Sequence, residues 1–372
     1  MQIGIFVVMA GRNAGGPETY EHSLVRNMAE LDQTNEYCIL CLSQQAANSF
    51  RLSRPNFRYR VLWPKSRILS MSLGLPWVLK KEGVELLHAA YVAPPFVPVN
   101  YLFTLHCSST FIHPEFYPPT VRLRLNSLIN NAIKYAKHII CVSQHVMESV
   151  IEHYGISQER MSVVHNGIGK NFRPVESSEY SRILSRYDIK DDYMLFVGRF
   201  EPRKNITRIL EAFNIYRHEV DNKTKLVLAG NKTWSRKEVD ETISRLDLAS
   251  HILEIGHVDN DDLPALYSGT KAFIFPSLWE GFGIPVIEAM ACGAPVLTSN
   301  LSALPEIAGN AALLVDPYSV TDIAAGMQRI VGETSLRSQL RQRGLVRAQE
   351  FSWQKTAQET FTVYNKLVTE KA

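Results

Sequence analysis

Residues 275–296 read FPSLWEGFGIPVIEAMACGAPV, and this stretch decides the fold of the chain. An apolar run ending at Phe275 indicates a buried strand, and Pro285 stands where a helix begins. The loop between them carries Glu280 and two glycines, so it presents backbone N–H groups at a helix start, where anionic or polar oxygens bind. Glu288 follows in the first turns of that helix. The two carboxylates can therefore reach different parts of one elongated ligand, and an acid at such a junction suits the paired hydroxyls of a ribose.

The same alternation of short apolar runs with helical patterns extends along the chain on both sides of this stretch. A first series runs from residue 3 to residue 164, and a second runs from residue 193 to residue 331. Continuous Ile, Val and Leu strands separated by helices are typical of parallel sheets covered on both faces. We therefore predict an α/β protein of two doubly wound, Rossmann-like domains whose ligand-binding strand ends face a central cleft.

Composition places the boundary between these two domains. Glycine, proline and a Ser/Glu-rich stretch follow residue 166, which is typical of a connecting segment. We assign residues 1–170 to an N-terminal domain, 171–192 to a linker and 193–353 to a C-terminal domain.

Length and composition exclude several classes of protein. The 372 residues exceed what one hydrophobic core organises, and 45% hydrophobic and 21% charged residues exclude a fibrous or disordered chain. Five scattered cysteines favour free thiols in a reducing compartment, so we expect a cytoplasmic protein. The longest weakly polar stretch, residues 89–99, contains three prolines and is too short to cross a bilayer.

Positive charge gathers in the first half of the chain. Residues 1–174 carry 17 Lys or Arg against 11 Asp or Glu. Basic and apolar side chains interleave in one stretch: Arg58, Arg60, Trp63, Lys65 and Arg67. Two interpretations stay open, namely a peripheral contact with an anionic membrane surface and an ordinary solvated basic face. No nucleic acid is expected as a partner, because no nucleic-acid-binding motif accompanies the charge.

Further motifs accompany the acidic pair of residues 280 and 288. They are Gly15-Gly16-Pro-Glu-Thr-Tyr, Val164-His-Asn-Gly-Ile168, Phe196-Val-Gly-Arg-Phe-Glu-Pro-Arg-Lys204-Asn205, Gly256-His-Val258 and Ser302-Ala-Leu-Pro-Glu-Ile-Ala-Gly309. Together with the E-x7-E spacing, they resemble the signature of the family-4 glycosyltransferases over nearly the whole chain. The resemblance implies the GT-B fold, with an acceptor-side first domain and a second domain that binds a nucleotide sugar. It also implies that the C-terminal helix, residues 354–372, packs back on the first domain.

The resemblance assigns roles to residues of the second domain. Arg199 and Lys204 would grip the donor diphosphate and stabilise the charge of the leaving group, in place of a metal ion. Glu280 would meet the transferred sugar near its C3 hydroxyl, and Glu288 would bind the ribose hydroxyls. The backbone of three residues would hold sugar hydroxyls and phosphate oxygens: Gly281, Phe282 and Gly283.

The nucleobase and the acceptor side complete the expected site. By resemblance, the backbone at His257 and Val258 contacts the nucleobase. In the first domain, the glycine loop of Gly15 and Gly16 approaches the diphosphate and the acceptor, and His106 approaches the donor sugar near its C6 hydroxyl. The catalytic set would therefore be Arg199, Lys204, Glu280 and His106. Many related sequences have aspartate after that histidine, but Cys107 stands here.

The expected reaction is transfer of a hexose from a nucleoside-diphosphate sugar to a hydroxyl acceptor with retention, without metal or other cofactor. UDP-glucose is favoured slightly over GDP-mannose as donor. The acceptor would be a saccharide or polyprenyl-linked saccharide of cell-surface polysaccharide synthesis, with the enzyme at the inner face of the membrane. A nucleotide-sugar epimerase, a sugar-phosphate synthase and a non-catalytic nucleotide-sugar sensor are the alternatives.

The Asp259-Asn-Asp261 spacing occurs in metal-dependent transferases. Here it falls in a turn before a helix, which favours helix capping.

Overall fold

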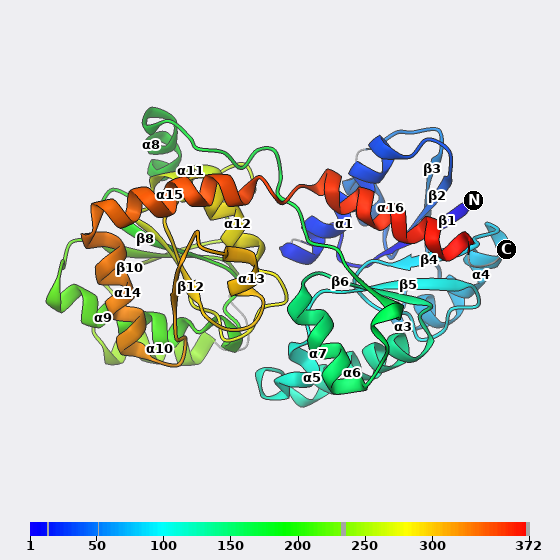
Figure 1. Ribbon diagram of the computed structural model, residues 1–372, viewed down its shortest axis with the longest axis horizontal. Helices are drawn as coiled ribbons and strands as arrows, with labels where there is room; N and C mark the ends of the chain where they lie inside the picture. Colours follow the sequence, from blue (N-terminus) through cyan, green and yellow to red (C-terminus); the bar gives the residue numbers. More distant parts are fainter. Residues whose placement is uncertain (13–14, 51, 232–235, 370–372) are drawn as a thin grey trace. The chain divides into compact units, whose positions relative to one another are not determined.

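A computed structural model describes residues 1–12, 15–50, 52–231 and 236–369 (Figure 1). The chain divides into two compact units. Unit 1 comprises Met1–Gly167 and Ser352–Ala372, and unit 2 comprises Ile168–Phe351. Each unit is built on its own parallel sheet, which confirms the predicted α/β class.

Unit 1 contains a seven-stranded parallel sheet within the described residues, in the order β3-β2-β1-β4-β5-β6-β7. The strands are β1 (Gln2–Val7), β2 (Glu36–Cys41), β3 (Phe57–Val61), β4 (Leu86–Ala89), β5 (Asn100–Leu105), β6 (His138–Cys141) and β7 (Met161–Val163). The helices are α1 (Gly16–Leu31), α2 (Gln44–Ser49), α3 (Arg67–Leu69), the π-helical turn η1 (Ser70–Gly74), α4 (Leu75–Lys81), α5 (Ser109–Ile112), α6 (Pro119–Tyr135), α7 (Gln144–Tyr154) and α16 (Trp353–Thr369), with 3₁₀ turns η2 (Pro114–Phe116) and η3 (Gln158–Arg160). The central strands are apolar on both faces because helices cover both sides of the sheet.

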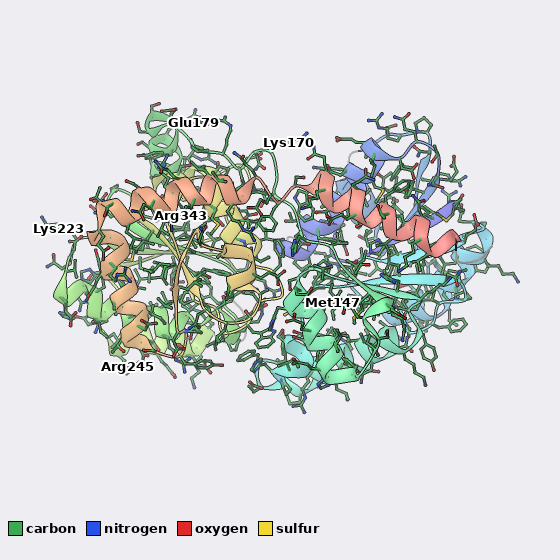
Figure 2. The ribbon with its side chains drawn as sticks, viewed as in Figure 1. Met147, Lys170, Glu179, Lys223, Arg245 and Arg343 are labelled. Atoms are coloured by element: carbon green, nitrogen blue, oxygen red, sulfur yellow. The ribbon has the colours of Figure 1, made fainter. Side chains whose placement is uncertain are left out.

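Unit 2 contains a six-stranded parallel sheet in its described part, in the order β10-β9-β8-β11-β12-β13. The strands are β8 (Tyr193–Val197), β9 (Lys225–Ala229), β10 (Ile252–Gly256), β11 (Ala272–Phe275), β12 (Val296–Ser299) and β13 (Leu313–Val315). The helices are α8 (Ser177–Arg186), α9 (Ile206–Glu219), α10 (Arg236–Arg245), α11 (Leu263–Gly269), α12 (Ile284–Ala291), α13 (Leu304–Ala308), α14 (Val320–Gly332) and α15 (Thr334–Ala348), with the 3₁₀ turn η4 (Pro202–Lys204). Charged side chains such as Lys223 and Arg245 lie on the outside of the unit (Figure 2).

The segment expected as a linker, residues 171–192, folds onto unit 2 instead of standing apart. It contains α8, whose Ile183 and Leu184 are buried in the core of that unit. The Arg186 guanidinium donates to both carboxylate oxygens of Asp262, at 3.1 and 2.7 Å. The Ser/Glu-rich composition concealed an amphipathic helix, because the few apolar residues recur at helical spacing.

The C-terminal helix α16 belongs to unit 1, where it packs against α1. The Tyr364 hydroxyl lies 2.7 Å from Nδ1 of the buried His88 in β4. At the start of the helix, Thr356 donates to the His165 carbonyl at 2.7 Å. Gly167 makes this approach possible, because a Cβ there would lie 2.1 Å from the backbone nitrogen of Trp353. The described part of α16 is thus fixed at Tyr364 to the same sheet that contains β1.

In each sheet the strand order reverses once along the sequence. The reversal falls between β1 and β4 in unit 1 and between β8 and β11 in unit 2. Ligands of doubly wound sheets bind outside the carboxyl ends of the strands at such a switch point. The loops after β8 and β11 are therefore the place in unit 2 to look for a site.

Candidate active site

Two loops that are far apart in the sequence meet at the switch point of unit 2. Strands β8 and β11 pair in parallel, and their loops carry residues 198–205 and 276–283. The backbone N–H of Leu278 donates to the Arg203 carbonyl at 2.8 Å and ties the two loops together. This junction brings Lys204 next to Glu280, a pair that the sequence analysis had placed at one site.

The centre of the site is a buried carboxylate held by two cations. The Lys204 ammonium donates to Glu280 Oε1, and the Arg203 guanidinium donates to Glu280 Oε2 at 2.8 Å. Burial opposes the negative charge of Glu280, but Arg203 and Lys204 more than offset it and hold its pKa below the usual range. Lys204 Nζ also lies 4.6 Å from the centre of the Phe275 ring, a cation–π contact. Glu280 is therefore ionised at neutral pH and fixed in position.

Arg199 joins this cluster through a second carboxylate. Glu201 accepts from Arg203 Nε at 3.0 Å, and its other oxygen lies 3.6 Å from Arg199 Nε. The Arg199 side chain is 48% exposed, so its guanidinium remains accessible to an anionic ligand. Three cations thus face two carboxylates in the cluster. The excess of positive charge at the end of a parallel strand suits a phosphate-bearing ligand.

Asn205 holds three loops of this site together. Its side-chain amide donates to the Pro276 carbonyl at 3.0 Å and to the Pro317 carbonyl at 2.7 Å, and the residue is buried. Its backbone adopts a left-handed conformation with φ 63°, which asparagine tolerates better than most residues. The sequence motif contained Asn205. Its hydrogen-bond partners are 71 and 112 residues away, and no pattern in the sequence predicts them.

The glycine loop before α12 is closely packed. Gly281, Phe282 and Gly283 are buried, and α12 begins at Ile284 with Pro285 in its first turn, as predicted. Gly283 has φ +100°, and a Cβ there would lie 2.8 Å from Leu304 Cδ2. On the other side, the Glu280 N–H donates to the Ser302 hydroxyl at 3.0 Å. The loop is therefore fixed from both directions, with its backbone at the helix start.

Glu288 lies apart from the charged cluster, one turn into α12. Its partner is Tyr267, whose hydroxyl donates to Glu288 Oε2 at 3.1 Å. Burial raises the pKa of Glu288 to about 7 although this hydrogen bond lowers it. A buried acid with one neutral donor has capacity left for further hydroxyl donors.

His257 and Val258 follow β10, as expected. His257 is exposed and Val258 is buried. Gly256 has φ +68°, and its carbonyl accepts from the Gly230 N–H at 2.6 Å, which joins the loops after β9 and β10. Asp259 lies in the turn before α11 and accepts backbone N–H groups through its carbonyl, whereas the N-cap residue is Asp262. Side-chain capping by the D-x-D pair is therefore not seen.

In unit 1 the glycine loop of Gly15 and Gly16 ends at α1, where Gly15 has φ 70°. Two carboxylates of α1 hold the part of this loop that follows β1. Glu21 accepts three backbone N–H groups, from residues 8, 9 and 10, each at 2.8 Å, and Glu18 accepts from Gly11 at 2.7 Å. Sequence reasoning missed both roles, although the two acids recur at helical spacing directly after the glycines.

His106, also in unit 1, follows β5. Its Nε2 donates to the Ala90 carbonyl at 2.8 Å, and burial lowers its pKa to about 4. The ring is therefore neutral at pH 7, with Nδ1 as a hydrogen-bond acceptor. The Cys107 sulfur lies 3.0 Å from the Ser109 hydroxyl, which lies 2.6 Å from the Tyr117 hydroxyl. A chain of one thiol and two hydroxyls thus follows His106.

Two parallel α/β units, one with a cationic cluster and a buried acid at its switch point, have the strand ends and the charge that suit a phosphate-bearing ligand. The model of the family "Glycosyltransferase Family 4" matches residues 14–171, and that of "Glycosyl transferases group 1" matches residues 182–347. The chain belongs to the family-4 glycosyltransferases.

Several similar proteins are named mannosyltransferases. The chain is 29% identical over 310 residues to the O-antigen chain mannosyltransferase B of Escherichia coli, covering 83% of this chain and 79% of that protein. It is 32% identical over 240 residues to the serotype-specific mannosyltransferase WbdA of Escherichia coli, covering 63% of this chain and 29% of that much longer protein.

Solved structures establish the fold over the whole chain. Sucrose-phosphate synthase from Thermosynechococcus elongatus matches with a TM-score of 0.78 at 20% identity, covering 100% of both chains. HepE from Anabaena matches with a TM-score of 0.79 at 17% identity, covering 98% of this chain and 99% of that one. The predicted GT-B fold is confirmed.

Proposed function

We propose that this glycosyltransferase transfers mannose from GDP-mannose to a hydroxyl of a saccharide acceptor, with retention at the anomeric carbon and without a metal ion. The observation that carries the proposal is the cluster of Lys204, Arg203 and Glu280 at the switch point of unit 2. It combines a surplus of positive charge, which a diphosphate requires, with a fixed carboxylate that can accept sugar hydroxyls.

The cluster can serve both functions at once. The Lys204 ammonium has three donors, and its bond to Glu280 leaves two for phosphate oxygens. Arg199, half exposed at the edge of the cluster, supplies the second cation for the departing diphosphate. Glu280 accepts hydroxyls of the transferred sugar, and the backbone of residues 281–283 contributes N–H donors. Charge that develops on the leaving phosphate is thus met by groups already in place.

Other residues bind the remaining parts of the donor. Glu288 accepts the ribose hydroxyls, and the backbone of His257 and Val258 meets the base. In unit 1, the loop at Gly15 and Gly16 contributes backbone contacts, and His106, neutral with a free Nδ1, accepts a sugar hydroxyl.

Mannose as the transferred sugar rests on the relatives. The sequence alone favoured UDP-glucose slightly, but the similar proteins of bacterial O-antigen synthesis are named mannosyltransferases. GDP-mannose was the other donor expected from the sequence, and we propose it in place of UDP-glucose.

The acceptor proposed is a lipid-linked saccharide in cell-surface polysaccharide synthesis, met at the cytoplasmic face of the membrane. The O-antigen roles in the relatives' names and the basic character of unit 1 support it. No helix in the described residues is long and apolar enough to cross a membrane. The enzyme would therefore meet such an acceptor peripherally.

A panel of nucleoside-diphosphate sugars, screened by thermal shift and then by nucleotide release, tests the proposal. A ligand at 100 times its dissociation constant stabilises the folded state by ~2.7 kcal/mol, which gives a clear shift. Stabilisation by GDP-mannose, followed by slow GDP release, is the expected result. A rise in melting temperature with UDP-glucose alone would overturn GDP-mannose as the donor. If no nucleoside-diphosphate sugar raised the melting temperature, the proposed transferase site would be overturned.

A further inference from the structure

Residues 63–81, the docking segment, expose large apolar side chains. The exposed fractions are Trp63 79%, Ile68 77%, Leu69 46%, Leu73 65% and Trp77 62%. Single exposed apolar residues are normal on a protein surface, but five within one short segment indicate a contact surface. The segment also carries four Lys or Arg and no Asp or Glu.

The helical part of the docking segment is apolar on two faces. Helix α3, the turn η1 and α4 follow one another without a break. Met71, Leu75 and Leu79 point inward and are buried in unit 1. Leu69, Leu73 and Trp77, each four residues apart, form the opposite, exposed face. A helix that served only the core of unit 1 would carry polar residues on that face.

Trp63 lies against the same helical run. Gly74, in the middle of the run, packs so closely on the backbone of Trp63 that a Cβ there would lie 2.1 Å from the Trp63 carbonyl oxygen. The backbone of Trp63, the most exposed of the five apolar residues, therefore lies beside the helical run that carries Leu73 and Trp77.

Cations stand at both ends of this apolar face without acidic partners. Among the described residues, no ion pair joins a carboxylate to Lys65, Arg67, Lys80 or Lys81. Lys81 Nζ lies 4.7 Å from the Trp77 ring. Burial and the like charges of Arg12 and Arg124 lower the pKa of Arg67, so two further cations lie near this end. The basic residues of β3 differ, because Arg60 pairs with Glu82 at 2.7 Å and Arg58 lies 3.9 Å from Glu36.

We infer that the docking segment binds the surface of an anionic lipid bilayer. Tryptophan prefers the level of the lipid headgroups, and leucine and isoleucine beside it can enter the acyl boundary. Lysine and arginine at the ends reach back to the phosphate groups of an anionic leaflet. A groove of about 590 Å³, lined in part by Trp77, Val84, Pro98 and Val99, continues the apolar surface beyond α4.

This inference rests on the proposed function for its biological purpose, because a lipid-linked acceptor requires the enzyme at a membrane. It keeps Trp63, Lys65 and Arg67 of the stretch that the sequence suggested, leaves out Arg58 and Arg60 of β3, and extends the membrane contact through α4. The physical evidence for binding is independent of the donor.

Vesicle sedimentation of the full chain tests the inference without any donor present. Phosphatidylcholine vesicles are compared with an equal mixture of phosphatidylcholine and phosphatidylglycerol. The wild type should bind the mixture and not phosphatidylcholine alone, with binding that weakens as salt rises. The double variant Leu73→Ser/Trp77→Ser should lose about tenfold or more in affinity, and Lys80→Gln/Lys81→Gln should bind more weakly with a smaller salt dependence.

Two matched controls distinguish binding through the docking segment from non-specific adsorption to vesicles. Arg58→Gln/Arg60→Gln removes two cations that are already near carboxylates, and Val346→Ser removes an apolar residue that is 65% exposed in unit 2. Both should bind vesicles like the wild type, and all variants should keep the wild-type melting temperature. Wild-type protein that fails to bind the mixed vesicles would overturn the inference. So would equal binding by Leu73→Ser/Trp77→Ser.

A turnover assay keeps the two proposals apart. With a water-soluble acceptor, Leu73→Ser/Trp77→Ser should release GDP at the wild-type rate, because the site residues are untouched. Vesicle binding without donor turnover would overturn only the proposed reaction, and turnover without vesicle binding would overturn only the docking segment.

Discussion

The Arg203 guanidinium donates to Glu280 Oε2 at 2.8 Å across two loops that are 77 residues apart in the sequence. The same guanidinium group reaches the Trp279 carbonyl at 3.3 Å and Glu201 at 3.0 Å. Arg203 is therefore a positioning residue that orients Glu280, while Lys204 faces the carboxylate from the other side.

Replacement of Arg203 should lower turnover by releasing Glu280. Arg203→Ala is expected to reduce kcat/KM by about 10- to 100-fold, since the carboxylate loses one of its two charged partners and its orientation. Arg203→Lys should be faster than Arg203→Ala but slower than the wild type. Lysine keeps the positive charge, but it cannot contact Glu280, Glu201 and the Trp279 carbonyl at once as the guanidinium does. Steady-state nucleotide release measures both variants. A rate for Arg203→Ala equal to that of the wild type would contradict the positioning role.

Lys204→Ala should have a larger effect on the chemical step. It removes the cation nearest to the proposed leaving group, and loss of one such stabilising group costs about 10²- to 10³-fold in kcat. The matched control is Lys190→Ala, on an exposed lysine of the same unit that pairs with Asp188 at 2.6 Å. Single-turnover rates at saturating donor distinguish a loss in kcat from a loss in binding. Near-normal turnover by Lys204→Ala would remove Lys204 from the mechanism.

Donor binding should depend on pH through Glu288. Its pKa lies near 7 in the free protein, and the ribose hydroxyls need its ionised form as acceptor. Binding therefore favours loss of the proton, and the Kd for GDP-mannose should rise as pH falls below 7, approaching about tenfold per pH unit. Glu288→Gln, which does not titrate, should bind more weakly at pH 8 and show a flat profile. Titration calorimetry from pH 5.5 to 8 measures the Kd of both proteins. If the Kd of the wild type and of Glu288→Gln changed with pH in the same way, Glu288 would not be the titrating ribose acceptor.

The same group should affect folding stability in the opposite sense to a salt-bridged acid. Between the ordinary glutamate pKa of 4.5 and about 7, the folded state binds more protons at Glu288 than the unfolded state does. The free energy of unfolding therefore decreases as pH rises through this window. Glu288→Gln should reduce that slope in urea denaturation without removing it, because Glu21 carries a similarly raised pKa of about 7.

Asn205 should contribute to stability as well as to the site. Asn205→Ala removes two buried hydrogen bonds. It also leaves alanine in a left-handed conformation at φ 63°, without the side-chain amide that stabilises asparagine there. We therefore expect about 2–4 kcal/mol of destabilisation. Asn205→Gly keeps the backbone conformation accessible and should lose less. The difference between the two variants in chemical denaturation isolates the backbone contribution. Equal stability of the alanine variant and the wild type would show that the loops do not depend on this residue.

Much of the fold follows from the sequence because buried parallel strands are continuous apolar runs. β1, β8 and β11 are of this kind, and Pro285 and the glycines around it mark the start of α12. β3 is harder to recognise in the sequence, because Arg58 and Arg60 alternate with other residues in an edge strand that is apolar on one side only.

The candidate site was predictable where chemistry and loop position coincide. Arg199, Lys204 and Glu280 stand beside strand ends, Glu288 lies one turn into α12, and the motifs that contain them resembled a known family. Arg203 escaped notice because it lies between two residues of the motif and its partner Glu280 becomes a neighbour only when β8 and β11 pair. Three residues of the docking segment, Trp63, Lys65 and Arg67, belong to the basic and apolar stretch found in the sequence. The exposed face of its helical part was not predicted, because the sequence cannot tell which of its two apolar faces is covered.

The most direct test of the central claim is titration of GDP-mannose into the wild type and into Lys204→Ala. The account predicts measurable binding to the wild type, weaker binding of UDP-glucose, and a Kd for Lys204→Ala raised by about tenfold or more, since a charged hydrogen bond to phosphate is lost. Absence of GDP-mannose binding to the wild type, or an unchanged Kd in Lys204→Ala, would contradict it.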